Sequence, residues 1–222
     1  MLATTTVLRP VGLNTRVYLD ANRLSRHTGW AHSFMAAWAL WGGLLLLAVL
    51  TIGAYWSARR RRDSAPSVAI VVLTGAASVI ALGLNQLVSH AAAEIRPYWT
   101  HASALVLVSK ANDYSFPSDH ATVAGALALG LAWYSWRFGI PAILVALFLA
   151  FARVYVGAHY PGDVVAGLLL GAAVAALVLA SLRKPAAVIA QRALSAMPFA
   201  VLVTSRRRGD LSDSRHDAAD SR

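Results

Sequence analysis

The chain has 222 residues, and its composition, 58% hydrophobic and 14% charged, is more apolar than that of ordinary soluble domains, which indicates a membrane protein. The net charge of +10 would also suit a nucleic-acid-binding protein, but the basic residues are gathered between apolar runs and in the tail, so no nucleic-acid partner is expected. Cysteine is absent, which excludes disulfides, iron–sulfur clusters and thiolate metal sites.

The first 29 residues mix arginines with small and apolar residues. The first fifteen lack a long apolar stretch, so no cleavable signal peptide is expected. Residues 17–26 fit a short helix lying at the membrane interface, and a loosely ordered arm is an equal alternative. Residues 1–29 are therefore assigned to an N-terminal arm.

Five apolar runs follow the arm, and about 20 helical residues are needed to cross the hydrocarbon core of a bilayer. The runs cover residues 31–56, 67–89, 117–136, 140–156 and 161–182. We therefore predict an all-α, membrane-embedded bundle of about five transmembrane helices over residues 30–184.

Several residues mark where these runs begin, end or contact one another. Pro117 and Pro161 predict helix starts, because proline is favoured in a first helical turn, where its missing N–H would be unbonded anyway. Residues Trp136–Gly139 predict a tight turn between the third and fourth runs. Asn85 and Gln86 lie within the second run, where we favour hydrogen bonds between helices over contact with a substrate.

The last segment, residues 185–222, is a basic C-terminal tail. Residues 188–204 are apolar enough to allow a sixth span, but Arg192 and Pro198 interrupt them. An interfacial helix followed by a disordered tail is therefore preferred.

The distribution of basic residues predicts the orientation of the chain. The loop at 57–66 holds four arginines, and the chain from Arg183 onward holds eight Lys or Arg, whereas the opposite connections hold few. Because Lys and Arg gather on the cytoplasmic side, the loop and the C-terminus are expected in the cytoplasm. The connections at 90–116 and around His159 are then extracytoplasmic, although the four arginines of the N-terminal arm argue against this orientation.

Three polar clusters lie at the ends of apolar runs on this outer side: Arg96-Pro97, Ser115–His120, and Arg153 with His159 and Asp163. Two arginines that converge suit the recognition of phosphate oxygens, and the alternative is that each extends to the interface by itself. The helix start at Ser118 supplies backbone N–H groups that attract anions. Ser118 is a candidate helix cap, a candidate phosphate ligand, or both.

His159 and Asp163 are four residues apart at the start of the fifth run and can share a helix face. A carboxylate that accepts a hydrogen bond from one imidazole nitrogen leaves the other nitrogen free to attack. His120, from another helix, would protonate the leaving oxygen. The alternatives are an isolated surface pair and a packing histidine. With one Glu and no His-Glu-x-x-His motif in the chain, neither a metal nor another cofactor is expected.

Together the motifs resemble those of the type 2 phosphatidic acid phosphatase superfamily, which covers membrane lipid phosphatases and soluble vanadium haloperoxidases. They are Arg96-Pro97, Pro117-Ser118-Asp119-His120 and Arg153-x5-His159-x3-Asp163. The resemblance implies the family's helical core, with His159 as the nucleophile that forms a phosphohistidine and Asp163 orienting it. It also implies His120 as general acid, and phosphate binding without a metal by Arg96, Arg153 and Ser118. The five apolar runs exclude a soluble haloperoxidase.

Two positions depart from the family pattern. Ser89 and His90 stand where the family has a Lys before Arg-Pro, and Ala152 stands where it commonly has Ser. Lys110 is therefore a candidate for the missing cation, and Asp119, where many members have Gly, is a further candidate in the phosphate site. Asp119 and the stretch from Ala152 to Pro161 are similar to the bacitracin-resistance branch of undecaprenyl-diphosphate phosphatases.

The expected function is hydrolysis of a polyprenyl diphosphate to the monophosphate in the recycling of the cell-wall lipid carrier, at the outer face of the bacterial plasma membrane. The alternatives are a phosphatase for another lipid phosphate, such as phosphatidic acid or phosphatidylglycerol phosphate, and a non-catalytic lipid-phosphate binder. The expected partners are the lipid substrate and the bilayer, and no oligomeric state is assigned.

Overall fold

The computed structural model describes residues 12–62 and 64–196, in which all regular elements are helices. The α-helices are α1 (Leu13–His27), α2 (His32–Ala37), α3 (Gly43–Arg59), α4 (Ser64–Ala92), α5 (Pro97–Thr100), α6 (Asp119–Tyr134), α7 (Trp136–Tyr155) and α8 (Pro161–Ala196). A 3-10 turn (Gly29–Ala31) precedes α2, and a π-helical turn (Trp38–Gly42) joins α2 to α3.

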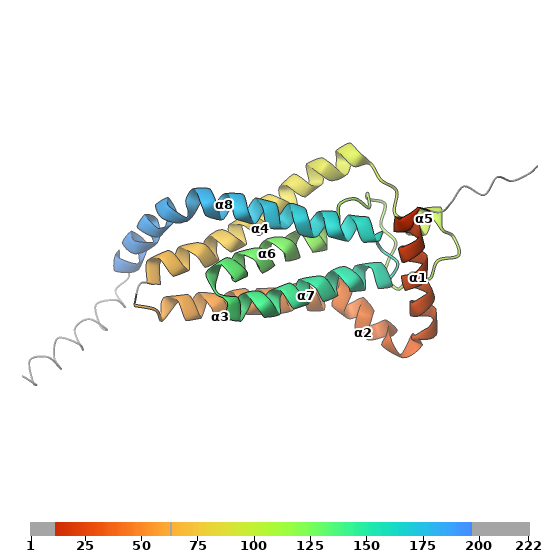
Figure 1. The fold of residues 1–222 in the computed structure, drawn as a ribbon, viewed down its shortest axis with the longest axis horizontal. Helices are drawn as coiled ribbons and strands as arrows, with labels where there is room; N and C mark the ends of the chain where they lie inside the picture. Colours follow the sequence, from red (N-terminus) through yellow and green to blue (C-terminus); the bar gives the residue numbers. More distant parts are fainter. Residues whose placement is uncertain (1–11, 63, 197–222) are drawn as a thin grey trace, which may run out of the picture.

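Five long helices run lengthwise through the bundle, while α1 and α5 lie at one end of it (Figure 1). α6 lies at the centre, where it packs against α4, α7 and α8. Its closest neighbour is α8: a Cβ on Gly171 would lie 1.9 Å from the carbonyl oxygen of Thr122, and one on Gly125 would lie 2.2 Å from that of Leu168. Glycine at these positions allows the two backbones to approach, as is common between membrane helices.

The five predicted apolar runs form the five long helices, which confirms the all-α bundle. Four helical segments are long and apolar enough to cross a membrane in the described part of the chain. They are Gly29–Arg59, Ser64–Thr100, Trp136–Tyr155 and Pro161–Leu194. The fifth helix, α6, has 16 residues, which is shorter than the roughly 20 that a full crossing needs, and its neighbours enclose it.

Two predicted boundaries are wrong. Residues Trp136–Gly139 are not a turn but the first turn of α7, and Ser135 alone, in an extended conformation, separates α7 from α6. Gly139 is needed for close approach instead, since a Cβ there would lie 2.4 Å from Cα of Ala132. The boundary predicted between residues 184 and 185 falls inside a helix, because α8 continues through Pro185 to Ala196.

Predictions for the two chain ends are only partly covered by the described residues. α1 forms a helix that is longer than the predicted 17–26, while its position at a membrane interface stays a prediction. Of the possible sixth span at 188–204, the part up to Ala196 belongs to α8, and the remainder lies outside the described residues.

The basic loop and the predicted site lie at opposite ends of the bundle (Figure 1). Arg61, in the α3–α4 loop, lies over the ring of Tyr134 at the end of α6, with 4.9 Å from its guanidinium carbon to the ring centroid. Arg183 of α8 lies 5.9 Å from the ring of Trp133 at this same end. The opposite end holds α5, the connection from α4 to α6, and the connection from α7 to α8.

Candidate active site

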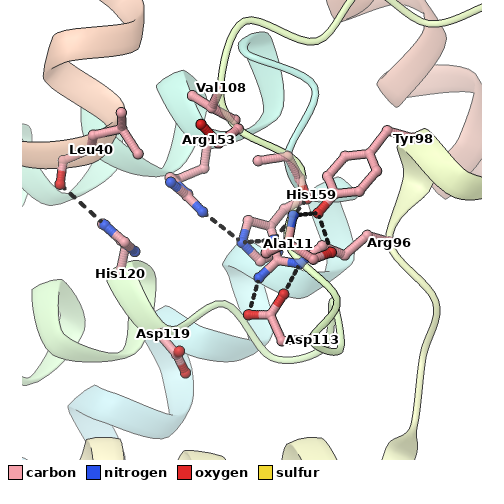
Figure 2. A pocket seen from close by; sticks show the side chains of 12 residues that line it. Leu40, Arg96, Tyr98, Val108, Ala111, Asp113, Asp119, His120, Arg153 and His159 are labelled. Carbon is pink, nitrogen blue, oxygen red and sulfur yellow. Dashed lines mark hydrogen bonds and ion pairs between the residues drawn. The ribbon is translucent and has the colours of Figure 1, made fainter.

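The three polar clusters meet around one cavity of about 230 Å³ (Figure 2). Arg96 directly precedes α5, His120 lies in the first turn of α6, Arg153 lies in the last turn of α7, and His159 lies between α7 and α8. All four line the cavity, so the sequence prediction that the clusters converge is borne out by the geometry.

His159 is buried and held by both of its ring nitrogens. Nδ1 lies 2.9 Å from the backbone oxygen of Ser115, which can only accept, so Nδ1 carries the proton and Nε2 is an unprotonated acceptor. Nη1 of Arg96 and Nη2 of Arg153 each donate to Nε2 over 3.1 Å. Burial, followed by the charges of Arg153 and Arg96, holds the pKa of His159 well below its ordinary value. The ring is therefore neutral, with its basic nitrogen facing two cations.

Asp163 supports His159 differently from the simple pair that the spacing predicted. Its Oδ2 lies 3.5 Å from Nδ1 of His159, while the nearer acceptor is the backbone oxygen of Ser115. The same Oδ2 accepts hydrogen bonds from the hydroxyl of Ser115 and from the backbone N–H of Tyr160. His159 lies two residues before Pro161, the first residue of α8. The regular helical geometry that the four-residue spacing assumed therefore does not apply to His159. Ser115 thus links Asp163 to His159.

Arg96 is clamped by a residue that the sequence reasoning missed. Its Nε and Nη2 donate to the two carboxylate oxygens of Asp113 over 2.7 and 2.8 Å. Nη1, the remaining nitrogen, also donates to the backbone oxygen of Ala158. Burial would raise the pKa of Asp113, but the hydrogen bond and the charge of Arg96 outweigh it and lower that pKa. Asp113 stays ionised, and it directs Nη1 of Arg96 toward His159.

Arg153 is held from the other side of the cavity. Its Nη1 donates to the backbone oxygen of Ala39 over 3.4 Å, which leaves Nη2 for His159. Arg96 and Arg153 are only 7% and 5% exposed, so the alternative that each extends separately to the interface is wrong. Nε of Arg153 is buried without a hydrogen-bond partner in the described residues and is therefore a free donor next to the cavity.

His120 makes its hydrogen bond to a backbone group of the first long segment. Its Nε2 lies 3.2 Å from the backbone oxygen of Leu40, in the π-helical turn. The carbonyl can only accept, so Nε2 carries a proton and Nδ1 is the nitrogen available for proton transfer. His120 lines the cavity together with His159.

Ser118 and Asp119 are placed less directly. Ser118 stands at the N-cap position of α6 without a capping side-chain bond, and its buried hydroxyl has no partner in the described part of the chain. Asp119 lines the cavity, but its Oδ1 accepts from the amides of Asn85 and Gln86 over 2.6 and 2.8 Å. These bonds tie α4 to α6, as expected for the two amides. Asp119 is better suited to this link than to phosphate, which its negative charge repels.

Lys110 does not take the place of the missing family lysine in this geometry. Its ammonium lies 5.8 and 5.3 Å from the ring centroids of Tyr98 and Trp99, and Lys110 does not line the cavity. Ser89 and His90, in the region of that lysine, line a neighbouring cavity of about 260 Å³ that shares Arg96 with the first. Among the described residues, no three His, Asp or Glu side chains form a possible metal site. The positive charges at the cavity are thus the two guanidinium groups.

Comparisons with known proteins place these residues in a family context. A model described as the PAP2 superfamily matches residues 67–186. Undecaprenyl-diphosphatase BcrC of Bacillus subtilis is 29% identical over 162 residues, which are 71% of this chain and 78% of that protein. A decaprenylphosphoryl-5-phosphoribose phosphatase of Mycobacterium tuberculosis is 36% identical over 136 residues, covering 61% of this chain and 70% of that protein.

The fold has solved counterparts as well. The PAP2-type phosphatidylglycerolphosphate phosphatase of Bacillus subtilis gives a TM-score of 0.52 at 21% sequence identity, covering 76% of this chain and 87% of that one. LpxE of Aquifex aeolicus gives 0.50 at 20% identity, covering 78% and 99%. At these identities the likeness concerns the fold alone.

Proposed function

The chain belongs to the PAP2 superfamily, and from this membership we propose that it hydrolyses a polyprenyl diphosphate to the monophosphate through a phosphohistidine on His159. The chain is an integral membrane lipid phosphatase. The name of the Bacillus subtilis relative, undecaprenyl-diphosphatase, supports the substrate class. A Sulfolobus acidocaldarius relative of the same name supports it as well. That relative is 40% identical over 95 residues, which are 42% of this chain and 46% of that protein.

One observation carries the proposal: the unprotonated Nε2 of His159 lies 3.1 Å from a guanidinium nitrogen of both Arg96 and Arg153. A phosphoryl group bound to these arginines would meet this nitrogen directly. Preorganised cations of this kind stabilise the charge that develops on phosphoryl oxygens in the transition state. The N-terminus of α6, at Asp119 and His120, adds the positive end of a helix dipole to the cavity wall.

In the first step, the lone pair of Nε2 of His159 forms a bond to the terminal phosphorus. The bond from that phosphorus to the bridging oxygen breaks, and its electron pair leaves with the polyprenyl monophosphate. His120, when protonated, gives its proton to this oxygen. Nδ1–H of His159 stays bonded to Ser115, where the carbonyl and the nearby carboxylate of Asp163 stabilise the positive charge on the ring.

In the second step, water attacks the phosphorus of the phosphohistidine. His120, now neutral, takes the proton of the attacking water, and the electron pair of the phosphorus–nitrogen bond returns to Nε2. Inorganic phosphate leaves, and both histidines regain their starting states. No metal enters these steps, because the two arginines supply the charge and His159 supplies the nucleophile.

A second candidate is hydrolysis of another lipid phosphate. The cavity, at about 230 Å³, has room for a phosphoryl head but not for a long lipid, so recognition of the tail must lie outside it. Relatives include the phosphoribose phosphatase described above and a lipid A 1-phosphatase of Rhizobium johnstonii, 48% identical over 58 residues that are 26% of this chain and 24% of that protein. A mere lipid-phosphate binder fits less well, because binding alone does not require a basic nitrogen between the two arginines.

The proposed place of the reaction is the extracytoplasmic face of a bacterial plasma membrane, in the recycling of a cell-wall lipid carrier. The separation of the arginine-rich loop from the cavity, at opposite ends of the bundle, supports this face (Figure 1). An outward-facing site would act where a lipid carrier is released as its diphosphate.

The test is phosphate release by the purified protein in detergent, with metals chelated, from polyprenyl diphosphate and from phosphatidic acid. We expect faster turnover of the diphosphate, loss of turnover in His159→Ala, and an acid-labile phosphoenzyme in the wild type. His27→Ala is the matched control, because His27 is exposed and does not line the cavity. A folded His159→Ala protein with full activity would refute the mechanism, and preference for phosphatidic acid would favour the second candidate.

A further inference from the structure

We propose that the π-helical turn Trp38–Gly42 is a positioning element of the active site, which holds His120 and Arg153 through two consecutive backbone carbonyls. The inference rests on the proposed function, because that function gives His120 its role as proton donor and Arg153 its role on the phosphoryl group. The turn carries no ionisable side chain, and its hydrogen bonds to the two site residues come from its backbone.

The turn interrupts an otherwise continuous helical segment. α2 leads directly into it and α3 directly out of it, and the backbone N–H of Gly43 bonds to the oxygen of Trp38, five residues back. In an α-helix each carbonyl is bonded by the N–H four residues later. Where the ladder changes from five-residue back to four-residue spacing, one carbonyl is passed over and becomes available to other groups. Such widened turns are rare and occur frequently at functional sites.

The carbonyls of this turn point to two different helices of the site. The oxygen of Ala39 accepts from Nη1 of Arg153 on α7, and that of Leu40 accepts from Nε2 of His120 on α6. Leu40 also lines the cavity, as Figure 2 shows, with its carbonyl directed at His120. One turn of the first long segment is thus bonded to two of the four central side chains.

The turn is also fixed against α7, the helix that carries Arg153. A Cβ on Gly43 would lie 2.9 Å from Cδ1 of Leu149, so the backbone directly after the turn touches a fully buried side chain of α7. The ring of Trp38 packs against Phe148, with 5.2 Å between centroids. The carbonyls therefore have fixed positions relative to the helix whose arginine they hold.

The two hydrogen bonds have different consequences. The carbonyl of Leu40 fixes the ring of His120 by accepting a hydrogen bond from its Nε2. A carbonyl at this position favours the protonated imidazole, which is the form that a proton donor needs. The bond to Ala39 occupies one nitrogen of Arg153 and leaves the next one for His159. Weakening the first should change the proton transfer, and weakening the second should change the handling of phosphate.

The sharpest test replaces single backbone amides with esters, because the side chains then remain unchanged. Replacing Trp41 with its α-hydroxy acid turns the carbonyl of Leu40 into an ester carbonyl, which is a weaker acceptor. We expect the alkaline limb of the kcat profile for polyprenyl diphosphate to move to lower pH, by roughly half a unit to one unit. The charged groups that line the cavity with His120 are unchanged in this variant: Arg96, Arg153, Asp113 and Asp119. His159 is unchanged as well.

The matched control replaces Leu40 with its α-hydroxy acid, which weakens the carbonyl of Ala39 instead. This variant should raise KM or lower kcat without moving the alkaline limb.

A second variant deletes Trp41, whose side chain is 69% exposed. Because a π turn holds one residue more than an α turn, the deletion restores a regular helix and keeps the apolar faces of α2 and α3 in register. We expect about a tenfold or greater loss of kcat, with Trp41→Ala close to wild type.

The outcomes separate the inference from the proposed function. If the wild type is active and both ester variants keep its alkaline limb, the inference is overturned and the proposed function remains intact. A wild type that releases no phosphate would refute the proposed function itself. If the deletion variant does not fold, the two ester variants still decide the question, because they alter neither the length of the chain nor its side chains.

Discussion

Arg96 meets Asp113 edge to edge, with two nitrogen–oxygen distances of 2.7 and 2.8 Å. Asp113 is 56% exposed in its side chain, whereas Arg96 is almost wholly buried, so the carboxylate reaches the arginine from the rim of the cavity. The pair fixes which nitrogen of Arg96 remains for His159. The orientation of Arg96 thus depends on Asp113, which belongs to the long connection between α5 and α6.

The first prediction concerns this pair. Asp113→Asn should lower kcat by about 10-fold or more, because one charge-assisted hydrogen bond is replaced by an unfavourable contact between two donors. Steady-state kinetics with polyprenyl diphosphate would measure the change. Asp20→Asn is the matched control, since Asp20 is an exposed carboxylate paired with Arg23 on α1. Wild-type kinetics in a folded Asp113→Asn protein would mean that Arg96 needs no clamp.

The second prediction concerns Asp163. Asp163→Asn should reduce kcat by about 10- to 100-fold, far less than His159→Ala, because the backbone oxygen of Ser115 still fixes the proton on Nδ1 of His159. In sites where the carboxylate is the sole acceptor, the corresponding change costs about 10⁴-fold. Rapid-quench measurement of phosphoenzyme formation would distinguish the two cases. A loss as large as that of His159→Ala would show that Ser115 cannot hold the tautomer.

The third prediction compares cations. Arg153→Lys should cost about 10- to 150-fold in kcat/KM, because lysine cannot supply two nitrogens to Ala39 and His159 at once. Lys110→Ala should change kcat/KM by less than about 3-fold, since Lys110 is exposed and does not line the cavity. An effect of Lys110→Ala as large as that of Arg153→Lys would show that the connection moves to supply a cation to bound phosphate.

The fourth prediction follows from the lowered pKa of His159. In the folded protein this histidine stays neutral below pH 6.5, whereas in the unfolded chain it takes up a proton near its ordinary pKa of about 6.5. The unfolded state therefore binds more protons as the pH falls, and stability should decrease below about pH 6.5. Thermal unfolding of wild type and His159→Gln between pH 7 and pH 5 would measure this. Parallel curves for the two proteins would contradict the assignment.

The fifth prediction concerns orientation. Because the native chain has no cysteine, single cysteines at Ala102 and Ser64 report on one side of the membrane each. An impermeant thiol reagent applied to intact cells should label position 102, two residues after the end of α5, and spare position 64, the first residue of α4 after the four arginines. Lysed cells serve as the control for reactivity. Labelling of position 64 and protection of position 102 would place the active site in the cytoplasm.

The sequence was informative where the candidate site consists of side chains at the ends of apolar runs. Arg96, His120, Arg153 and His159 could be found because charged and polar residues beside such runs are few, and all four line one cavity. The helical bundle could be predicted from the lengths of the runs alone. The ends of the helices were harder to predict. Gly139 resembles a turn residue, yet it lies inside α7, where it allows close packing.

The rest of the site depends on backbone groups and on a loop. The carbonyls of Ser115, Ala39 and Leu40 hold three central side chains, and a carbonyl contact has no signature in the residue type that provides it. Asp113 lies in a connection without periodicity, so its distance from Arg96 could not be anticipated. The π-helical turn likewise could not be anticipated, because its residues are ordinary apolar ones.

The shortness of α6 determines how deep the chemistry lies. Its 16 residues extend about 24 Å, whereas the hydrocarbon core is about 30 Å thick. Trp133, beside Arg183 at the far end of α6, has the aromatic and basic character of residues that lie at a membrane interface. With that end at one interface and α6 along the bilayer normal, His120 at the near end would lie roughly 6 Å beneath the opposite edge of the hydrocarbon layer. For the proposed reaction, the phosphate group of the lipid would then have to move below the interface to reach His120, and the hydrolytic water would have to reach the same depth.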